Sequence, residues 1–213
     1  MTKRSSEAEQ QRIHSLYEQQ RQAGAAACVI GVDEVGRGAV AGPLTVAAVV
    51  LPLEPCILGL DDSKRLSPGR REELAAEIKA AALATGIAHI EAAIIDRIGM
   101  AASLRAAMAQ AIEACEAEPD LVLIDGRPIH VHKKERCIVK GDSKVACIAA
   151  ASILAKVTRD LIMVAADEKY PGYGLAANKG YASAEHIQAI RDKGLTAFHR
   201  SSFCHNFIQQ QLF

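Results

Sequence analysis

An apolar run that ends in two adjacent acids constrains this chain more than any other feature. Residues 26–32 (AACVIGV) predict a strand too apolar to face water, and Asp33 and Glu34 follow it directly. Carboxylates at the end of a buried strand are costly unless a cation compensates them. Arg37 could do so alone, but a divalent metal ion would do so better. The glycines at 36 and 38 would let the backbone approach a ligand closely. This stretch therefore indicates metal-dependent chemistry on a phosphate.

The same stretch also fits a dinucleotide-binding fingerprint, because residues 36–41 (GRGAVA) match G-x-G-x-x-G/A after a strand. That motif requires a helix whose N-terminus faces the pyrophosphate. Here Gly42 and Pro43 follow, and residues 44–51 then form a β-branched run that predicts a strand. Two carboxylates would also repel a pyrophosphate. We therefore reject a dinucleotide site.

Two further strand-like segments also end in acids. Residues 121–124 (LVLI) precede Asp125, and residues 136–140 lie just before Asp142. Strand ends in α/β sheets tend to meet at one crevice, where four carboxylates raise one another's pKa unless cations are present. Oxygen ligands without His or Cys favour Mg²⁺ or Mn²⁺, and two such ions about 4 Å apart would serve in-line phosphoryl transfer. Taken singly, each acid is more typical of a cap or a turn, and Asp142 before Ser143 fits an N-cap. That interpretation weakens because all three acidic sites fall at strand ends and one of them is a doubled acid.

The remaining patterning predicts an α/β protein with a mixed five-stranded sheet. Hairpin-linked strands come first and helix-linked strands later, which favours helices packed on a partly parallel sheet. The expected helices cover about 6–22, 67–84, 98–117 and 143–168, and the expected strands cover 26–33, 44–51, 87–95, 121–124 and 136–140. A loop over 170–181 precedes one or two short helices. We expect a helical extension over 1–24, a catalytic domain over 25–168 and a C-terminal lobe over 169–213.

Charge is balanced over the 213 residues but not along the chain. Residues 1–125 carry 12 basic and 18 acidic side chains, whereas residues 126–213 carry 13 and 7. Seven of the eight aromatic residues also lie in the second part. An acidic half beside a basic, aromatic half suits a metal site next to a nucleic-acid groove. Charge alone, however, favours a mixed, solvated surface.

Cysteine usage and hydropathy indicate the compartment. The six cysteines show no C-x-x-C pairing and lie mostly in apolar runs, which predicts free thiols in a reducing environment. No run is long enough to span a membrane, and the N-terminus lacks an apolar signal core. We therefore expect a cytoplasmic protein with no membrane partner.

Seven separated motifs together resemble one family. They are GVDEVGRG (31–38), DDSKRLS (61–67), LIDG (123–126), KGDSK (140–144), AAASILAKVTRD (149–160), NKGYAS (178–183) and HRSSF (199–203). In order and spacing they resemble bacterial ribonuclease HII, a type 2 ribonuclease H. The resemblance implies a ribonuclease H-like fold with a small C-terminal helical lobe and a two-metal mechanism with Mg²⁺ or Mn²⁺. It also implies cleavage of the RNA strand in RNA–DNA hybrids and incision of DNA at single embedded ribonucleotides, leaving 5′-phosphate and 3′-hydroxyl ends.

The resemblance also implies roles for individual residues. The metal-binding catalytic acids would be Asp33, Glu34, Asp125 and Asp142. The turn that recognises the ribose 2′-OH would be Gly36, Arg37 and Gly38, and the ring that packs on the sugar at the RNA–DNA junction would be Tyr181. Phosphate contacts would come from Lys64, Lys144 and Arg200. Two positions depart from the family pattern, because Ser201 replaces an arginine and Asn178 replaces a common histidine, but no metal ligand is missing.

Two other functions fit part of the pattern. A Holliday-junction resolvase of the same fold also uses clustered carboxylates and magnesium, but it has no use for a turn and a tyrosine that read a 2′-OH. A catalytically idle nucleic-acid-binding module is the other alternative. Retention of all four acids argues against it, because carboxylates without metal only weaken phosphate binding.

The extreme C-terminus suggests a protein partner. Gln209, Leu212 and Phe213 resemble the pentapeptide with which bacterial replication proteins dock onto the sliding clamp, and a free tail with two apolar side chains suits such docking. Against this, Gln210 stands where leucine is usual. The alternative is a final helix packed on the core, with an apolar face formed by Phe207, Ile208, Leu212 and Phe213. We expect the protein to be a monomer.

Overall fold

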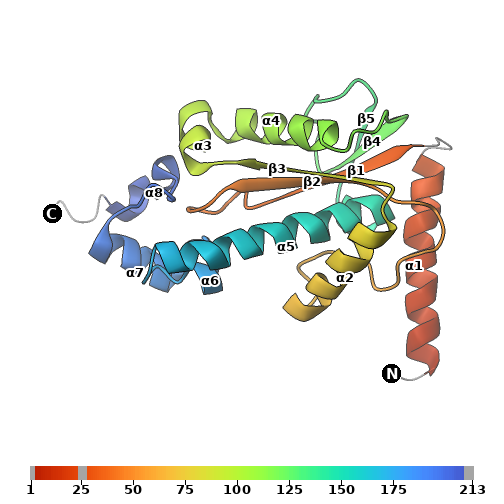
Figure 1. The fold of residues 1–213 in the computed structure, drawn as a ribbon, viewed down its shortest axis with the longest axis horizontal. Coiled ribbons are helices and arrows are strands. Elements are labelled where there is room, and N and C mark those ends of the chain that lie inside the picture. Colours follow the sequence, from red (N-terminus) through yellow and green to blue (C-terminus); the bar gives the residue numbers. More distant parts are fainter. Residues whose placement is uncertain (1–2, 24–27, 209–213) are drawn as a thin grey trace.

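A five-stranded mixed sheet forms the centre of the molecule (Figure 1). The structure, a computed structural model, describes residues 3–23 and 28–208. The strand order is β3-β2-β1-β4-β5, with β1 antiparallel to β2, β2 antiparallel to β3, and β1, β4 and β5 parallel to one another. The strands are β1 (Val29–Val35), β2 (Leu44–Val50), β3 (Ala84–Ile90), β4 (Leu121–Asp125) and β5 (Glu135–Ile138). The predicted mixed sheet flanked by helices is confirmed.

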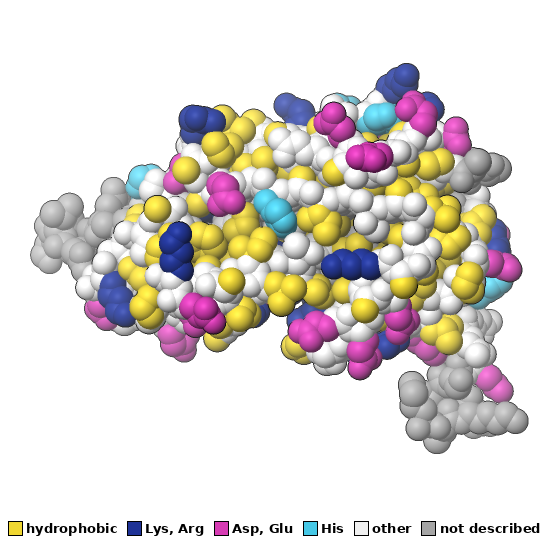
Figure 2. Space-filling view, in the orientation of Figure 1, with side chains coloured by type: hydrophobic (Ala, Val, Ile, Leu, Met, Phe, Trp, Pro, Cys, Tyr) yellow, Lys and Arg dark blue, Asp and Glu magenta, His cyan; other side chains and the backbone are white. Residues whose placement is uncertain are grey.

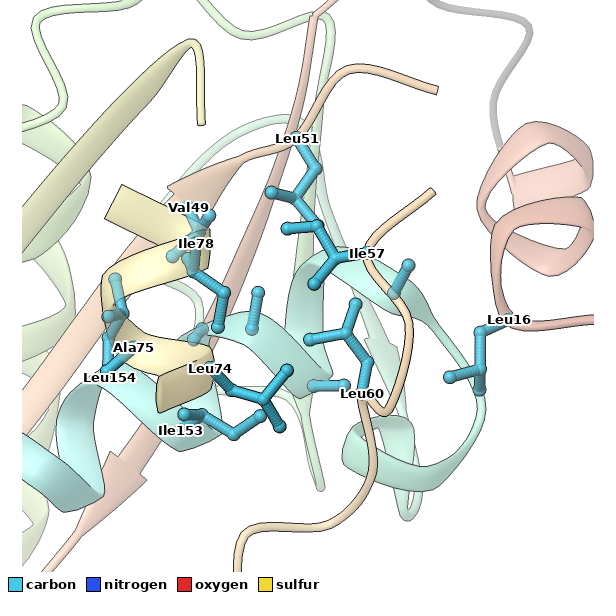
Figure 3. Packing of buried hydrophobic residues seen from close by; sticks show 14 of the residues in the cluster. Leu16, Val49, Leu51, Ile57, Leu60, Leu74, Ala75, Ile78, Ile153 and Leu154 are labelled. Carbon is cyan, nitrogen blue, oxygen red and sulfur yellow. The ribbon is translucent and has the colours of Figure 1, made fainter. Parts of the chain in front are cut away.

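Helices cover both faces of this sheet. On one face lies α4 (Met100–Glu113) with α3 (Ala92–Ile98) beside it, and along the other runs α5 (Ala146–Lys169) (Figure 1). Outside α5 pack α2 (Pro68–Ala81) and α1 (Lys3–Ala23). Each face therefore has its own apolar cluster. The cluster on the α5 side joins α1, α2, α5 and the sheet, and Figure 3 shows its interdigitating leucines and isoleucines.

The long helix α5 lies unusually close to the strand that ends in acids. Its first half is rich in buried alanines, which keep the surface of the helix flat. Gly31 of β1 faces the helix, and a Cβ at this position would lie 2.3 Å from the carbonyl carbon of Cys147. Only glycine fits at this contact. Backbone therefore packs on backbone here, and α5 has a fixed position relative to the end of β1.

A small helical lobe completes the chain at the end of the molecule opposite α1 (Figure 1). It contains α6 (Leu175–Asn178), α7 (Ala184–Lys193) and α8 (Ser201–Ile208). Its apolar cluster includes Met163 of α5 together with Val40 and Ala41, which follow β1. An isolated antiparallel bridge also pairs Ala41 with His199. The lobe is thus attached directly to the segment that follows the acid pair.

Three expected element boundaries are wrong. The strand expected over 87–95 is β3 at Ala84–Ile90, and the residues after Glu91 form α3 instead. Gly99, with φ at 79°, separates α3 from α4, so the helix expected over 98–117 begins at Met100 and ends at Glu113. The helix expected from residue 143 begins at Ala146, because Gly141–Ser143 form a 3₁₀ turn. Asp142 is therefore not the N-cap of α5, a position that Val145 occupies.

The surface and the cysteines bear on the remaining expectations from composition. All six cysteines are free, as predicted. Within the described residues, no helix is both long enough and apolar enough to cross a membrane. On the face shown in Figure 2, acidic and basic side chains lie interspersed, so this face does not separate the charges as the two halves of the sequence do.

Candidate active site

Four acids come together where two parallel strands end. Asp33 and Glu34 lie at the end of β1, and Asp125 is the last residue of the neighbouring strand β4. Asp142 lies in the 3₁₀ turn that follows β5. The backbone N–H of Gly141 donates to Oδ1 of Asp125 at 2.6 Å, which ties this turn to the end of β4. The structure thus places the acids at the same end of the sheet, as their positions after strand-like segments predicted.

The acids are buried and interact electrostatically. Asp33 is 6% exposed, and burial raises its pKa well above the usual range, with the charges of Glu34 and Asp125 adding to the increase. Burial also raises the pKa of Glu34, and the charge of Asp125 adds to it. The pKa of Asp142 is raised by burial and by the charges of Asp62 and Asp125. Like charges held this close are relieved by a bound cation.

Lys64 faces this acid cluster from the loop before α2. Burial alone would lower its pKa, but the charges of Asp62, Asp142 and Asp33 contribute to a net increase. The ammonium group therefore partly neutralises the acids. Its predicted contact with a substrate phosphate stays a prediction.

Two serines connect the Lys64 loop to the catalytic strand. The hydroxyl of Ser63 lies 3.0 Å from that of Ser152 on α5, and Ser152 in turn hydrogen-bonds the carboxyl group of Asp33. An ionised carboxylate can only accept a hydrogen bond. When Asp33 is ionised, Ser152 therefore donates to it and accepts from Ser63. The pair orients the carboxylate of Asp33 from inside the protein.

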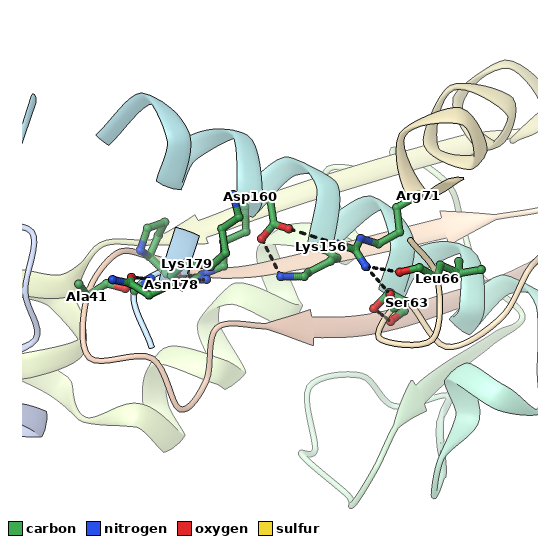
Figure 4. Close-up of polar contacts among 12 residues, drawn as sticks. Ala41, Ser63, Leu66, Arg71, Lys156, Asp160, Asn178 and Lys179 are labelled. Carbon is green, nitrogen blue, oxygen red and sulfur yellow. Dashed lines mark hydrogen bonds and ion pairs between the residues drawn. The ribbon is translucent and has the colours of Figure 1, made fainter. Parts of the chain in front are cut away.

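An arginine holds the same loop from the α2 side. Nη1 of Arg71 donates to the carbonyl oxygens of Ser63 at 2.9 Å and Leu66 at 2.6 Å (Figure 4). Asp160 of α5 lies 3.9 Å from Nη2 of Arg71 and 2.7 Å from Nζ of Lys156. The loop beside the acids is thus fixed to two helices.

The donor set fits a hard divalent cation. All four side chains offer carboxylate oxygens, which suit Mg²⁺ or Mn²⁺ better than zinc. Among residues 3–23 and 28–208, however, no group of three or more His, Cys, Asp or Glu side chains is arranged to hold a metal ion. An ion at this edge would therefore retain positions for water or substrate oxygens, as Mg²⁺ commonly does.

The turn beyond the acids exposes its backbone. Gly36 has φ at 85°, and a Cβ there would lie 2.2 Å from Nε of Arg159, so the inner side of the turn is filled. At Gly38 a Cβ would meet no atom within 4 Å, so its outer side is open. The side chain of Arg37 is 62% exposed, with Nη1 3.8 Å from Oε1 of Glu34. A ligand can approach this backbone closely from the solvent side.

Arg200 supports the turn from within. Its side chain is fully buried, and Nη1 donates to the carbonyl oxygens of Gly36 at 2.7 Å and Ala39 at 2.8 Å. Nε donates to the carbonyl oxygen of Gly42 at 3.0 Å. The expectation that Arg200 contacts a phosphate is therefore wrong, because the guanidinium is enclosed and most of its donors point at backbone oxygens.

The tyrosine predicted to pack on a sugar lies next to this turn. Tyr181 is 39% exposed, and the preceding residue, Gly180, accepts hydrogen bonds from the backbone N–H groups of Val40 at 2.8 Å and Ala41 at 3.1 Å. Asn178 folds the loop, because its Oδ1 accepts from the N–H of Gly180 at 2.8 Å. The structure thus brings Tyr181 and the Gly-Arg-Gly turn together, and Asn178 has a structural role here.

Comparison with known proteins identifies the family. A family model described as Ribonuclease HII matches residues 30–206. The chain belongs to the ribonuclease HII family. It is 49% identical over 205 residues to ribonuclease HII of Moorella thermoacetica, covering 95% of this chain and all of that one. It is also 46% identical over 176 residues to ribonuclease HII of Geobacter sulfurreducens, covering 82% of this chain and 81% of that one. The chain is thus an endoribonuclease that acts on the RNA strand of RNA–DNA hybrids.

Solved structures confirm the fold. The ribonuclease H2 of Pyrococcus horikoshii matches with a TM-score of 0.72 at 24% identity, over 86% of this chain and 98% of that one. A structure described as the PCNA:RNase HII complex from Archaeoglobus fulgidus matches with a TM-score of 0.69 at 28% identity, over 81% of this chain and 93% of that one. The ribonuclease H-like architecture inferred from the motifs is therefore correct.

Two further positions of the ribonuclease HII motifs have defined contacts. Nζ of Lys144 donates to the carbonyl oxygen of Val139 at 2.8 Å, and its predicted phosphate contact stays a prediction. Ser201 donates from its N–H and its hydroxyl to Oδ2 of Asp96 at 2.7 and 2.8 Å. The serine thus joins the start of α8 to α3.

Sequence reasoning assigned no role to two polar residues of α5 that support the site. Ser152 and Arg159 both belong to the motif at 149–160 and are buried on α5. They are seven residues apart, close to two helical turns, so they lie near one face of the helix. Buried polar residues at this spacing were the available signal.

Proposed function

We propose that this enzyme incises DNA at single embedded ribonucleotides, as well as cutting uniform hybrids, by a two-metal mechanism that leaves 5′-phosphate and 3′-hydroxyl ends. One observation carries the proposal. The acids at the end of β1 lie on the same segment as an open Gly-Arg-Gly turn, Asp125 ends the neighbouring strand β4, and Tyr181 lies beside the turn. A site for hydrolysis and a site for sugar recognition are therefore adjacent.

The four acids would hold the ions. When bound, two divalent ions supply the charge that activates the attacking water and stabilises the leaving oxygen. Asp33, Glu34, Asp125 and Asp142 provide the hard oxygen ligands, and Ser152 orients Asp33. A protein of the same fold, with a TM-score of 0.61 at 20% identity, is described as Bst-RNase HIII in complex with Mn²⁺. We propose Mg²⁺ or Mn²⁺ for this chain as well.

The turn and the tyrosine would recognise the sugar. A protein distinguishes RNA from DNA through the 2′-OH or through helix shape. The turn of Gly36, Arg37 and Gly38, in which Arg37 and Gly38 are exposed, would hydrogen-bond a 2′-OH through its backbone. The ring of Tyr181 would pack on the next sugar if that sugar lacks a hydroxyl. Lys64 and Lys144 would contact phosphates, and Arg37 would stabilise the acid-rich turn.

A cleavage assay tests this function. Labelled duplexes carrying one ribonucleotide, a uniform hybrid strand or no ribonucleotide are incubated with Mg²⁺ or with EDTA. We expect cutting of the first two in Mg²⁺ only, with products that a ligase can rejoin because they carry 5′-phosphates. Asp33→Asn and Asp125→Asn should abolish cleavage but retain duplex binding, since the ligands are lost and the binding surface remains.

Matched controls complete the assay. Glu72→Gln, an exposed substitution on α2, should cut at the wild-type rate. A four-way DNA junction should remain intact, whereas its cleavage would favour a resolvase. Near wild-type turnover by Asp33→Asn or Asp125→Asn in Mg²⁺ would contradict the metal assignment.

We also propose that the C-terminal tail binds a sliding clamp. Gln209, Leu212 and Phe213 lie outside the described residues, so support comes from the sequence and from the relative described as the PCNA:RNase HII complex. A tether of this kind would raise the enzyme's effective concentration on replicated DNA. In a clamp titration, removal of residues 209–213 should abolish binding without lowering cleavage. Equal binding by the full and shortened chains would exclude this tail.

A further inference from the structure

One buried arginine joins the two segments that face the sugar. Arg159 of α5 is fully buried, and its Nε donates to the carbonyl oxygen of Pro43 at 2.9 Å, and its Nη2 to that of Ala41 at 3.0 Å. Its Nη1 donates to the carbonyl oxygen of Lys179 at 2.8 Å. A single planar group therefore spans the segment after the Gly-Arg-Gly turn and the loop before the tyrosine.

The same guanidinium also contacts the turn and the aromatic ring. Its Cζ lies 5.5 Å from the ring centroid of Tyr181, within the range of a cation–π interaction. The stem of Arg159 fills the space beneath Gly36, where a Cβ would come within 2.2 Å of Nε. One side chain thus fixes the turn, the loop and the ring relative to one another.

Stability does not explain this arrangement. Neither Arg159 nor Arg200 forms an ion pair within residues 3–23 and 28–208, and both cations are buried among backbone carbonyls. A buried charge without a countercharge is a poor source of stability. Arginine does provide a rigid fork of donors that lysine, a point charge on a flexible stem, does not reproduce. The value of Arg159 therefore lies in geometry.

We propose that Arg159 is a positioning residue that sets the place and tilt of the Tyr181 ring relative to the backbone of residues 36–38, and so determines the preference for an RNA–DNA junction over a uniform hybrid. This proposal rests on the sugar-packing role proposed for Tyr181. Arg159 itself touches no substrate. It acts through the ring that it underlies and the loop backbone that it holds.

The test compares Arg159→Lys with the wild-type enzyme on two substrates. We expect kcat/KM on a single-ribonucleotide duplex to fall about tenfold more than on a uniform hybrid, because a small misplacement of a recognition group is costly. Both rates come from one preparation, so any unfolded fraction cancels in their ratio. Arg159→Gln provides a second variant in case buried lysine is not tolerated. An unchanged ratio in a folded variant would overturn the proposal.

A double-mutant cycle separates positioning from general damage. If Arg159 acts through Tyr181, Arg159→Lys should cause no further loss of preference in a Tyr181→Ala background. Fully additive effects would overturn the proposal. As a matched control, Met108→Ala creates a cavity on the opposite face of the sheet and should lower the unfolding midpoint while leaving the substrate ratio unchanged.

A spectroscopic readout keeps this proposal distinct from the proposed function. The protein is labelled with 3-fluorotyrosine, and the ¹⁹F resonance of Tyr181 is assigned by its absence in Tyr181→Phe. Arg159→Lys should shift or broaden this resonance, and an unchanged resonance would overturn the positioning role. If Tyr181→Ala leaves the substrate preference intact, the sugar-packing role fails even where the resonance moves.

Discussion

The ionised carboxylate of Asp33 lowers the stability of the folded protein, because the side chain is buried. Burial raises its pKa, so the folded state holds this proton more tightly than the unfolded chain, whose aspartates titrate near pH 4. In the window above that pH, the unfolding free energy therefore falls as pH rises. The group that would bind metal thus weakens the metal-free fold at neutral pH.

Removing this charge should stabilise the metal-free protein. At pH 7 in EDTA, we expect Asp33→Asn to melt above the wild type, with about 3 °C for each kcal/mol gained in a domain of this size. The difference should nearly vanish by about pH 3, where Asp33 is protonated in both the folded and the unfolded wild type. Calorimetry at both pH values checks this, with Glu72→Gln as an exposed control. A lower melting point at pH 7 would show that hydrogen bonds to Asp33 outweigh its burial.

The exposed ring of Tyr181 should matter for one substrate more than for another. A single embedded ribonucleotide has a deoxyribose just beyond the cut, whereas a uniform hybrid does not. We expect Tyr181→Ala to reduce kcat/KM on the first by about tenfold or more, the scale of a lost stacking contact, and on the second much less. Parallel kinetics on the two duplexes decide this, and equal losses would reduce Tyr181 to general packing.

Among the elements, β1 and β4 were predictable because each is a wholly apolar run with an acid at its end. The boundary between β3 and α3 was not, since residues 84–98 are rich in small and apolar side chains that suit either element. The burial of Arg159 and Arg200 was beyond sequence patterning as well. Except for Lys179, their carbonyl partners lie more than 100 residues away in the chain, so only tertiary contact places these arginines inside.

The C-terminal lobe contains a buried pair of neutral histidines. Nε2 of His186 lies 3.1 Å from Nε2 of His199, and Nδ1 of His186 lies 2.9 Å from the carbonyl oxygen of Tyr181. Nδ1 of His199 accepts from the N–H of Thr196 at 3.1 Å. These contacts fit a chain in which His199 donates to His186 and His186 donates to Tyr181, and an added proton would break it.

The histidine pair predicts a loss of stability in acid. Burial and the neighbouring His186 lower the pKa of His199 to about 4, whereas an unfolded histidine titrates near 6.5. The contribution of neutral His199 to the unfolding free energy is therefore complete above pH 6.5. As pH falls toward 4 this contribution, up to about 3 kcal/mol, is lost. When unfolding free energies are measured with urea from pH 7.5 to 4.5, their decrease with falling pH should be smaller in His199→Gln than in the wild type. Identical slopes would place the acid sensitivity elsewhere.

At the scale of the whole molecule, divalent metal should stabilise the fold. The acids converge only when β1, β4 and the 141–143 turn are in place, so an ion would bind the folded chain preferentially. At about 100 times the dissociation constant, such binding adds about 2.7 kcal/mol. The melting temperature of the wild type should rise when Mg²⁺ or Mn²⁺ is added, and that of Asp125→Asn should not change. A rise of equal size in that variant would place the ion at another site.

The single uninterrupted helix α5 has one more consequence. Its residue 152 adjoins the catalytic acid and its residue 159 adjoins the sugar-facing tyrosine, about 10 Å further along the axis. Under the proposed function, α5 fixes the distance between the catalytic acids and the sugar-binding tyrosine. The cut therefore falls at a constant distance from the RNA–DNA junction, whatever the base sequence. One residue inserted between positions 152 and 159 would rotate residue 159 by about 100° around the helix axis relative to residue 152. Such a variant would retain both side chains but cut at a different distance from the junction.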